Sequence, residues 1–394
     1  MTQIRSLSVA DLMPRAAVGL DTAPLRQLVA GRRVLVTGAG GSIGSELCRQ
    51  LAALAPARLI LLERHENSLY DVANGLRDRE RGCRESVAAV VADITDETQI
   101  RGVFEEHRPG MVFHAAAHKH VPLMEDNPCE AVKNNVGGTR RLMNVAEQTG
   151  VGRFVLISSD KAVNPTSVMG ATKRIAELMA QVRNGNGPTA FITVRFGNVL
   201  GSNGSVVPRF LEQIRAGGPV TVTHPEARRF FMLIPEAVQL VLHAAVRGQP
   251  GATYVLEMGE PMKILDLARN LIRLSGFVPD EDIAIRFSGL RPGEKLDEEL
   301  VGPDEVTAPS ALAKILRVEQ RTMPDPRRLH EQVRDLEEAA RSGSPTATLD
   351  AVRVVLPRFG KDRATAAVHQ EPTAPAPKVQ EHSRMRYRIV SSRP

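Results

Sequence analysis

The stretch RRVLVTGAGGSIGSELCRQL, residues 32–51, decides how the rest of the chain is read. Its first part is short, apolar and rich in β-branched residues, which predicts a buried strand. Three glycines, Gly38, Gly41 and Gly44, follow at GxxGxxG spacing, and an amphipathic helix is predicted directly after them. Glycine permits a tight turn and a close approach of backbone to phosphate, while a helix N-terminus favours an anion. The stretch therefore predicts a site for the pyrophosphate of a dinucleotide.

Strand-like and helical segments alternate from this stretch to about residue 199. The apolar runs predicted as further strands cover residues 57–63, 86–94, 110–117, 153–159 and 189–199. Helices are predicted between them, for example over residues 129–148 and 171–182. Nearly continuous apolar strands that alternate with helices form parallel sheets covered on both faces. The predicted fold class is therefore α/β, with a doubly wound parallel sheet.

The order of these segments predicts four regions along the chain. Residues 1–30 form a lead-in with one short helix before Gly31, and residues 31–199 form the nucleotide-binding domain. Residues 200–359 form mainly a smaller substrate lobe, although some later segments return to the first domain. Helices are predicted in this part over residues 235–246, 264–274 and 324–340. Residues 360–394 are rich in Ala, Pro, Thr, Gln and Arg, which predicts a disordered tail.

The composition is that of an ordinary soluble protein, with 394 residues of which 42% are hydrophobic and 24% charged. No apolar run is long enough to span a bilayer and no secretory signal is evident, so we expect a cytoplasmic location. Three scattered cysteines fit a reducing compartment. The net charge of +6 indicates either a basic tail or an anionic partner, such as a phosphorylated substrate or an acidic membrane surface. Nucleic acid is not expected, because no basic patch with aromatic residues is present.

Residues after the second and third predicted strands extend the nucleotide site. Glu63 ends the second strand, where a carboxylate accepts hydrogen bonds from adenosine ribose hydroxyls, which favours NAD. Arg64 follows directly and could meet a 2′-phosphate, so NADP stays possible. Asp93 and Ile94 come after the third strand, where adenine would lie. The alternative for Asp93 is a cap on the helix predicted from TDETQI.

Six motifs together carry a resemblance to a known superfamily. They are TGAGGSIG, FHAAAHKHVPLMEDNP, NNVGGT, SSDKAVNPTSVMGATK, RFGNVLGSNGSVVPRF and LRPGEK. Together they resemble the extended short-chain dehydrogenases/reductases, which have a Rossmann fold, over about residues 31–320. More narrowly, they resemble bacterial nucleotide-sugar 4,6-dehydratases that act on UDP-N-acetylglucosamine in polysaccharide and glycan biosynthesis. The resemblance implies a cofactor set of Gly38, Gly41, Ser42, Ile43, Gly44, Glu63, Arg64, Asp93, Ile94, Ala115, Ala116 and Lys173.

The segment SSDKAVNPTSVMGATK, residues 158–173, is called the strip below. In such dehydratases a hydride leaves C4 of the sugar, C5 loses a proton, water leaves C6, and the hydride returns to C6. The resemblance implies that Ser159 holds the C4 oxygen, Asp160 is the acid for C6, and Lys161 handles the C5 proton. An adjacent carboxylate and ammonium in a closed site are expected to be tuned towards neutral pH. The alternative is a surface ion pair at a strand end.

The superfamily usually carries a YxxxK motif in the strip, and here Lys173 is the lysine while Met169 takes the place of the tyrosine. Lys173 is implied to bind the nicotinamide ribose. The three tyrosines of the chain all lie outside the strip, so no shifted register restores the motif. The resemblance places the chain in a branch with methionine at this position, which is implied to retain the configuration at C5. The alternative for Met169 is packing in the core or against the ligand.

Several polar residues outside the strip suit a nucleoside diphosphate sugar. They are Lys119, Asn135, Asn198, Arg229, Arg291 and Glu294. Lys119 would face the substrate, Asn135 would bridge strands near the strip, and Asn198 would contact the diphosphate. The two arginines offer bidentate phosphate binding and Glu294 would accept from the nucleoside ribose, the alternative being salt bridges between the lobes. No metal is expected, because no ligand set converges with the histidines of HAAAHKH.

Two other functions stay open beside the dehydratase. A nucleotide-sugar epimerase needs no acid at C6, so the Ser-Asp-Lys triplet argues against it. A non-catalytic NAD-binding scaffold is suggested only by the missing tyrosine. The resemblance also implies a homo-oligomer, built through helices beside the fourth and fifth strands. Many relatives have transmembrane helices and a second nucleotide-binding region ahead of the matching segment, so this chain resembles a soluble catalytic half or a truncated product.

Overall fold

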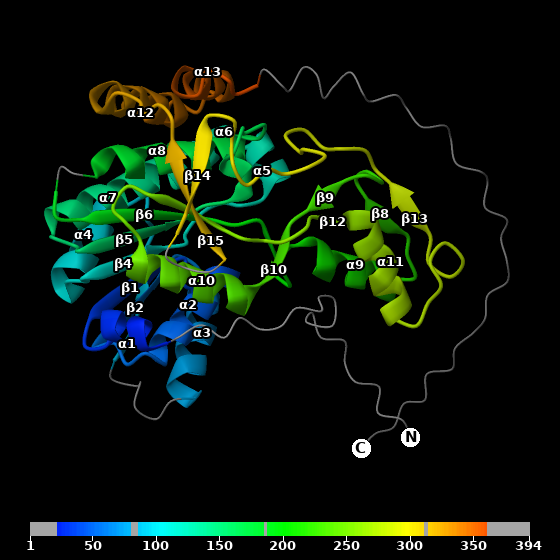
Figure 1. Ribbon diagram of the computed structural model, residues 1–394, viewed down its shortest axis with the longest axis horizontal. Helices are drawn as coiled ribbons and strands as arrows, with labels where there is room; N and C mark the ends of the chain where they lie inside the picture. The colour runs from blue at the N-terminus through cyan, green and yellow to red at the C-terminus, as the bar shows by residue number, and fades with distance from the viewer. Residues whose placement is uncertain (1–21, 80–85, 185–186, 311–313, 361–394) are drawn as a thin grey trace.

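The computed structural model describes residues 22–79, 86–184, 187–310 and 314–360. A nine-stranded sheet has the order β14-β15-β11-β6-β5-β4-β1-β2-β3 and forms the larger body in Figure 1. The six strands predicted from the sequence are β1 (Arg33–Thr37), β2 (Arg58–Glu63), β3 (Val87–Val91), β4 (Met111–His114), β5 (Arg153–Ile157) and β6 (Ala190–Arg195). All six are parallel, and the chain reverses direction across the sheet between β1 and β4. The predicted doubly wound sheet is confirmed.

Helices cover both faces of this sheet because successive strand residues point to opposite sides. Leu35 packs with the helices of one face, while Val34 and Val36 pack with those of the other. The first face carries α4 (Glu97–His107), α5 (Val121–Asp126), α6 (Pro128–Val132), η2 (Lys133–Gly138), α7 (Thr139–Gln148) and α8 (Val168–Arg183). The second face carries α1 (Ala23–Val29), α2 (Ser42–Ala52), α3 (Glu66–Arg79) and α10 (Ile234–Arg247). The short helix expected before Gly31 is α1.

Two details of these helices differ from the sequence prediction. The helix expected over residues 129–148 contains a π-helical turn, η2, between α6 and α7. Helix α4 is capped by Asp96, whose side chain accepts from the backbone of Gln99 at 3.0 Å. The alternative of Asp93 as the cap is therefore wrong, because Asp96 is the residue next to the first helical turn.

Later segments of the chain return to the sheet. Strand β11 (Thr253–Leu256) pairs in parallel with β6, and β15 (Ile315–Gln320) and β14 (Glu305–Pro309) extend the edge in antiparallel pairing. Helices α12 (Pro326–Arg341) and α13 (Pro345–Val355) form an outer layer over α6, η2 and α8, at the top of Figure 1. These covered helices are among those beside β4 and β5, and the homo-oligomer expected through that surface stays a prediction.

A smaller lobe lies beside the carboxyl ends of β5 and β6, on the right of Figure 1. It contains β7 (Asn198–Leu200), α9 (Val206–Arg215), β8 (Val220–Val222), β9 (Arg228–Arg229), β10 (Phe231–Leu233), β12 (Met262–Lys263), α11 (Ile264–Leu274) and β13 (Ile285–Phe287). The lobe has its own apolar core, to which α9 and α11 contribute. No described helix is long and apolar enough to cross a membrane. The predicted tail, residues 361–394, and residues 1–21 lie outside the described part of the chain.

Candidate cofactor and substrate site

The glycine turn brings β1, the segment after β4 and the start of α2 closer together than side chains would permit. Gly38 has φ of +68°, and a Cβ there would lie 2.6 Å from the backbone nitrogen of Ala116. A Cβ at Gly44 would collide with the carbonyl oxygen of Gly38. Gly41 occupies the N-cap of α2 without a side-chain cap, so the backbone N–H groups of Ser42, Ile43 and Gly44 precede the first intrahelical bond, which Ser45 donates to the Gly41 carbonyl. This turn has the form that an anion at a helix N-terminus requires.

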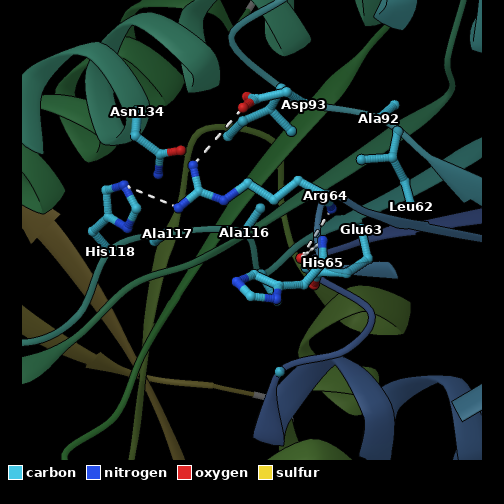
Figure 2. A pocket seen from close by; sticks show the side chains of 14 residues that line it. Leu62, Glu63, Arg64, His65, Ala92, Asp93, Ala116, Ala117, His118 and Asn134 are labelled. Atoms are coloured by element: carbon cyan, nitrogen blue, oxygen red, sulfur yellow. Dashed lines mark hydrogen bonds and ion pairs between the residues drawn. The ribbon is translucent and has the colours of Figure 1, made fainter. Parts of the chain in front are cut away.

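A cavity of about 210 Å³ opens beside this turn, at the carboxyl ends of β1 to β4. Figure 2 shows the side chains that line it. Eight residues of the predicted cofactor set contribute to its wall: Gly38, Gly41, Glu63, Arg64, Asp93, Ile94, Ala115 and Ala116. The remaining lining residues are Leu62, His65, Ala92, Ala117, His118 and Asn134. Ser42, Ile43, Gly44 and Lys173 do not line this cavity; the first three begin α2, and Lys173 lies in α8.

The Glu63 carboxylate is fixed at the wall of the cavity by backbone amides. Its Oε2 accepts from the nitrogen of Gly40 at 3.1 Å, and its Oε1 accepts from those of Arg64 and His65 at 2.9 and 3.1 Å. Three N–H donors hold the negative charge in one place, and no cation among the described residues pairs with it. A hydroxyl donor entering the cavity would meet a pre-oriented acceptor.

Arg64 extends across the cavity towards the opposite wall (Figure 2). Its guanidinium lies 3.8 Å from Asp93 Oδ2 and 3.5 Å from His118 Nε2. His118 in turn lies 3.3 Å from Glu130. The other carboxylate oxygen of Asp93 accepts from both the backbone and the hydroxyl of Thr95 at 2.8 Å. Arg64 is therefore already paired with an acidic residue inside the predicted nucleotide site.

The three predicted catalytic side chains are in hydrogen-bond contact at the carboxyl end of β5. They begin the 3₁₀ turn η3 (Asp160–Ala162). Ser159 Oγ donates to Asp160 Oδ1 at 2.8 Å, and Lys161 Nζ donates to the same oxygen at 3.0 Å. Asp160 is fully buried, and its Oδ2 has no hydrogen-bond partner among the described residues. The alternative of a surface ion pair is wrong, because the carboxylate is removed from solvent.

A second carboxylate, Glu298, reaches the same lysine from the segment after the smaller lobe. Its Oε1 lies 3.6 Å from Lys161 Nζ and 3.8 Å from Arg229 Nε. Burial disfavours the charge of Lys161, but Asp160 and Glu298 outweigh that penalty and raise the pKa of the lysine. The expected tuning of this lysine towards neutral pH is therefore wrong for this arrangement, because two carboxylates surround one ammonium.

Helix α8 positions the other two strip residues. Lys173 is buried and its Nζ donates to the carbonyl oxygen of Ile157 at 2.5 Å. Burial lowers the pKa of Lys173 to about 8, against a smaller opposing effect of Glu177. Met169 is 4% exposed and belongs to the core between the sheet and its first layer of helices. Packing in the core is thus the role that its surroundings indicate.

The sequence of the chain is similar to those of known proteins. The profile of a family described as "Polysaccharide biosynthesis protein" matches residues 34–320. The chain belongs to this family. The capsular polysaccharide biosynthesis protein CapD of Staphylococcus aureus is 52% identical over 318 residues, which are 80% of this chain and 53% of that protein. The chain thus spans about half the length of the curated relatives that it matches at this level.

More distant relatives are named for an enzymatic activity. A UDP-N-acetylglucosamine 4,6-dehydratase (inverting) of Campylobacter jejuni is 30% identical over 70% of this chain and 78% of its own length. A UDP-glucose 4-epimerase of Rickettsia canadensis is 32% identical over 73% of this chain and 82% of its own. Among solved structures, Pen from Bacillus thuringiensis superposes with a TM-score of 0.66 and 31% identity, covering 75% of this chain and 90% of that one. The family therefore groups this chain with nucleotide-sugar dehydratases and epimerases.

Two of the predicted substrate residues, Asn198 and Asn135, form hydrogen bonds with the strip. Asn198 accepts from Lys161 Nζ at 3.0 Å through its side-chain oxygen. Asn135 is buried in η2 and bonds the backbone of His118 and the hydroxyl of Thr172. It therefore bridges the loop after β4 to helix α8 rather than two strands. Lys119 donates to the carbonyl oxygen of Asn203 at 2.9 Å, on the lobe side.

The later substrate residues are paired within the protein. Arg229 donates to the carbonyl oxygens of Leu296 and Lys295 at 2.9 and 2.8 Å, besides its contact with Glu298. Arg291 and Glu294 pair with each other at 2.6 Å. The contact of Arg229 with Glu298 agrees with the alternative of a salt bridge between the lobes, whereas the Arg291–Glu294 pair is local to one segment and does not join the lobes.

The histidines that could have suggested a metal have other partners. His114 is buried between the hydroxyls of Thr37 and Thr139 at 2.7 and 2.8 Å, and burial lowers its pKa to about 3. It is a neutral link between β1, β4 and α7. Within the described ranges, no group of three or more His, Cys, Asp or Glu residues is arranged to hold a metal ion.

Proposed function

We propose that the chain is a nucleotide-sugar 4,6-dehydratase that converts UDP-N-acetylglucosamine, or a close UDP-hexosamine, to its 4-keto-6-deoxy derivative for polysaccharide biosynthesis. The buried Ser159–Asp160–Lys161 cluster carries this proposal. It lies at the carboxyl end of β5, the edge of a parallel sheet where ligands bind. In its protonated form Asp160 can give a proton to a leaving hydroxyl there, through the oxygen that has no partner among the described residues, and an epimerase does not need this step.

The described residues fit NAD as the resident cofactor. The glycine turn leaves space that a Cβ would fill, and the adjoining cavity has the cofactor set along its wall. The anchored Glu63 carboxylate suits the two ribose hydroxyls of NAD and would repel the 2′-phosphate of NADP. Arg64, which could have favoured that phosphate, is paired with Asp93. When bound, NAD supplies a hydride acceptor for C4 that later returns the hydride to C6.

The proton transfers fall to the strip. Ser159 Oγ would hold the C4 oxygen through the hydroxyl that now donates to Asp160, and one of the three strip side chains has to take the C4 hydroxyl proton as the hydride leaves. Asp160 would first take the proton that Lys161 gives up across their 3.0 Å contact and would then pass it to the C6 oxygen, so that the C–O bond breaks and water leaves. Lys161 would take the proton from C5, for which its Nζ has to be neutral at that moment. The elimination therefore needs the lysine to give up the proton that its two carboxylate neighbours now stabilise.

The test is incubation of the protein with UDP-N-acetylglucosamine in D₂O, followed by mass spectrometry and NMR. A dehydratase gives a 4-keto-6-deoxy sugar with deuterium at C5, and the methionine branch implies retained configuration there. Recovery of unchanged sugar without solvent exchange would contradict the proposal for this substrate. A C4 epimer without loss of water would instead support the epimerase, and cofactor binding without any turnover would support the scaffold.

A further inference from the structure

The segment Arg291–Glu299 lies along the strip although it is distant in the sequence. Three hydrogen bonds join the two segments: Thr166 Oγ1 to the Gly293 carbonyl, Lys295 Nζ to the Val163 carbonyl, and Asn164 Nδ2 to Glu299, each at 3.0 Å. Gly293 has φ of +79°, and a Cβ there would come within 2.8 Å of Glu125 and 2.9 Å of Ser167. This close docking fixes the position of the whole segment on the strip.

Glu298 is the point at which this segment touches the proposed chemistry. Its side chain is 4% exposed, its Oε1 faces both Lys161 and Arg229, and its Oε2 has no partner among the described residues. Resting on the proposed function, we propose that Glu298 is a positioning residue, which holds Lys161 Nζ beside Asp160. In this role Glu298 would connect the proton transfer at Lys161 with the segment Arg291–Glu299, which carries the proposed nucleotide contacts. Glu298 acts on the reaction only through the lysine.

The link to the nucleotide follows from what else the segment carries. Arg291 and Glu294, the proposed contacts for phosphate and ribose, stand on the same segment as Glu298. Arg229 of the smaller lobe bonds the carbonyl oxygens of Lys295 and Leu296, between these two ends. A ligand that binds Arg291 and Glu294 would therefore contact the same backbone segment that places Glu298 against Lys161.

The electrostatic consequence has a definite sign. Four side chains face the Lys161 ammonium: Asp160 and Glu298 stabilise its charge, Arg229 opposes it, and Asn198 accepts a hydrogen bond. Burial alone would lower the pKa of this lysine. Withdrawing Glu298 removes one of the two carboxylates, so it moves the titration of Lys161 to lower pH and makes the neutral amine easier to form.

A direct test is an NMR titration of the full chain labelled with ¹³Cε-lysine. The sequence has only nine lysines, and the signal of Lys161 is assigned by its loss in Lys161→Met. Glu298→Gln is expected to move the titration of Lys161 to lower pH than in the wild type. Glu299→Gln is the matched control, because Glu299 is exposed and pairs with Lys295 and Asn164. Equal titration of Lys161 in the wild type and in folded Glu298→Gln would overturn the inference.

Further measurements keep the inference testable if Glu298→Gln does not fold or if the proposed function is wrong. Glu298→Asp keeps the charge, so its Lys161 should titrate closer to the wild type than that of Glu298→Gln. A wild-type Lys161 that titrates below an ordinary lysine would also overturn the inference, without any variant. With active enzyme, the limb of the pH–kcat profile governed by Lys161 should shift to lower pH in Glu298→Gln, with little change in KM. A shifted titration without turnover of UDP-N-acetylglucosamine would support the positioning role and refute only the substrate.

Discussion

Two ion clusters in this protein both combine buried carboxylates with cations, but their carboxylates differ in how fully they are hydrogen-bonded. The strip cluster consists of Asp160, Lys161 and Glu298, and each carboxylate keeps one oxygen without a partner among the described residues. The sheet cluster consists of Arg174, Glu177, Arg195 and Glu305. There every carboxylate oxygen accepts at least two hydrogen bonds, from the two arginines, Ser158, Gly302 and Gln320.

We infer from this difference that the sheet cluster supports the fold, whereas the strip cluster takes part in the proposed reaction. Arg195 is fully buried and bonds both glutamates with distances of 2.6–2.7 Å, which ties β6 to α8 and to the edge strand β14. Buried polar atoms are almost always satisfied, so an unpaired carboxylate oxygen in a closed place indicates a site that awaits a ligand.

The largest effect is expected when the strip cluster loses its acid. Asp160→Asn keeps the shape of the side chain but cannot give a proton to a leaving hydroxyl. General acid catalysis contributes roughly 10²–10⁴-fold, so we expect a loss of turnover of about that size with the fold preserved. Turnover of UDP-N-acetylglucosamine and circular dichroism measure the two quantities. Asp304→Asn, at an exposed ion pair with Arg358, is the control that should leave turnover unchanged.

The opposite result is expected when the sheet cluster loses its central cation. Arg195→Met leaves Glu177 and Glu305 buried with fewer donors. Breaking a buried pair on one side costs about 3–5 kcal/mol of unfolding free energy. Urea unfolding should show this loss, while Arg353→Met at an exposed pair should stay within about 0.5 kcal/mol of the wild type. A stable Arg195→Met protein that has lost only turnover would reverse the roles given to the two clusters.

Residues that are adjacent in the sequence were predictable as parts of the site, whereas residues that only the fold brings together were not. The glycine turn and the Ser159–Asp160–Lys161 triplet were predictable because each is continuous in sequence and follows a recognisable strand. The contact of Glu298 with Lys161 was not predictable, because the acidic run that follows RPGEK is typical of a solvated surface. Only the tertiary structure places this run against the strip. His118 and Asn134 were missed as cavity residues although their motifs, HAAAHKH and NNVGGT, were recognised.

Pairing between distant segments also explains the residues whose predicted contacts differ. Arg229, Arg291 and Glu294 were expected to face phosphate and ribose, but each has a protein partner in this structure. Their charge was evident in the sequence, whereas the carbonyl oxygens that satisfy Arg229 belong to a segment placed by tertiary packing. Residue type predicts which interactions are possible, and the fold selects among them.

A smaller effect is expected from acid on the sheet cluster. Burial opposes the ionisation of Glu305, but hydrogen bonds and charge from Arg195 outweigh it and lower its pKa to about 2. A carboxylate whose pKa is lower in the folded state stabilises the fold above its ordinary pKa and loses that contribution as the pH falls. Unfolding free energy should therefore fall from about pH 4.5 towards pH 2, the values that bound this shift. In Glu305→Gln the decline should be shallower, and an unchanged slope would contradict the assigned pKa.

The smallest effect is expected at Met169, where the superfamily usually has its tyrosine. The side chain is buried in the core of α8, so Met169→Leu is a nearly volume-conserving exchange that should cost less than about 1.5 kcal/mol. Turnover should stay close to the wild type, because a thioether moves no proton. Met179→Leu, buried farther along the same helix, is the matched control. If Met169→Leu alone lost turnover while both variants kept their stability, Met169 would have to contact the substrate, and proton transfer by the strip cluster would depend on that contact.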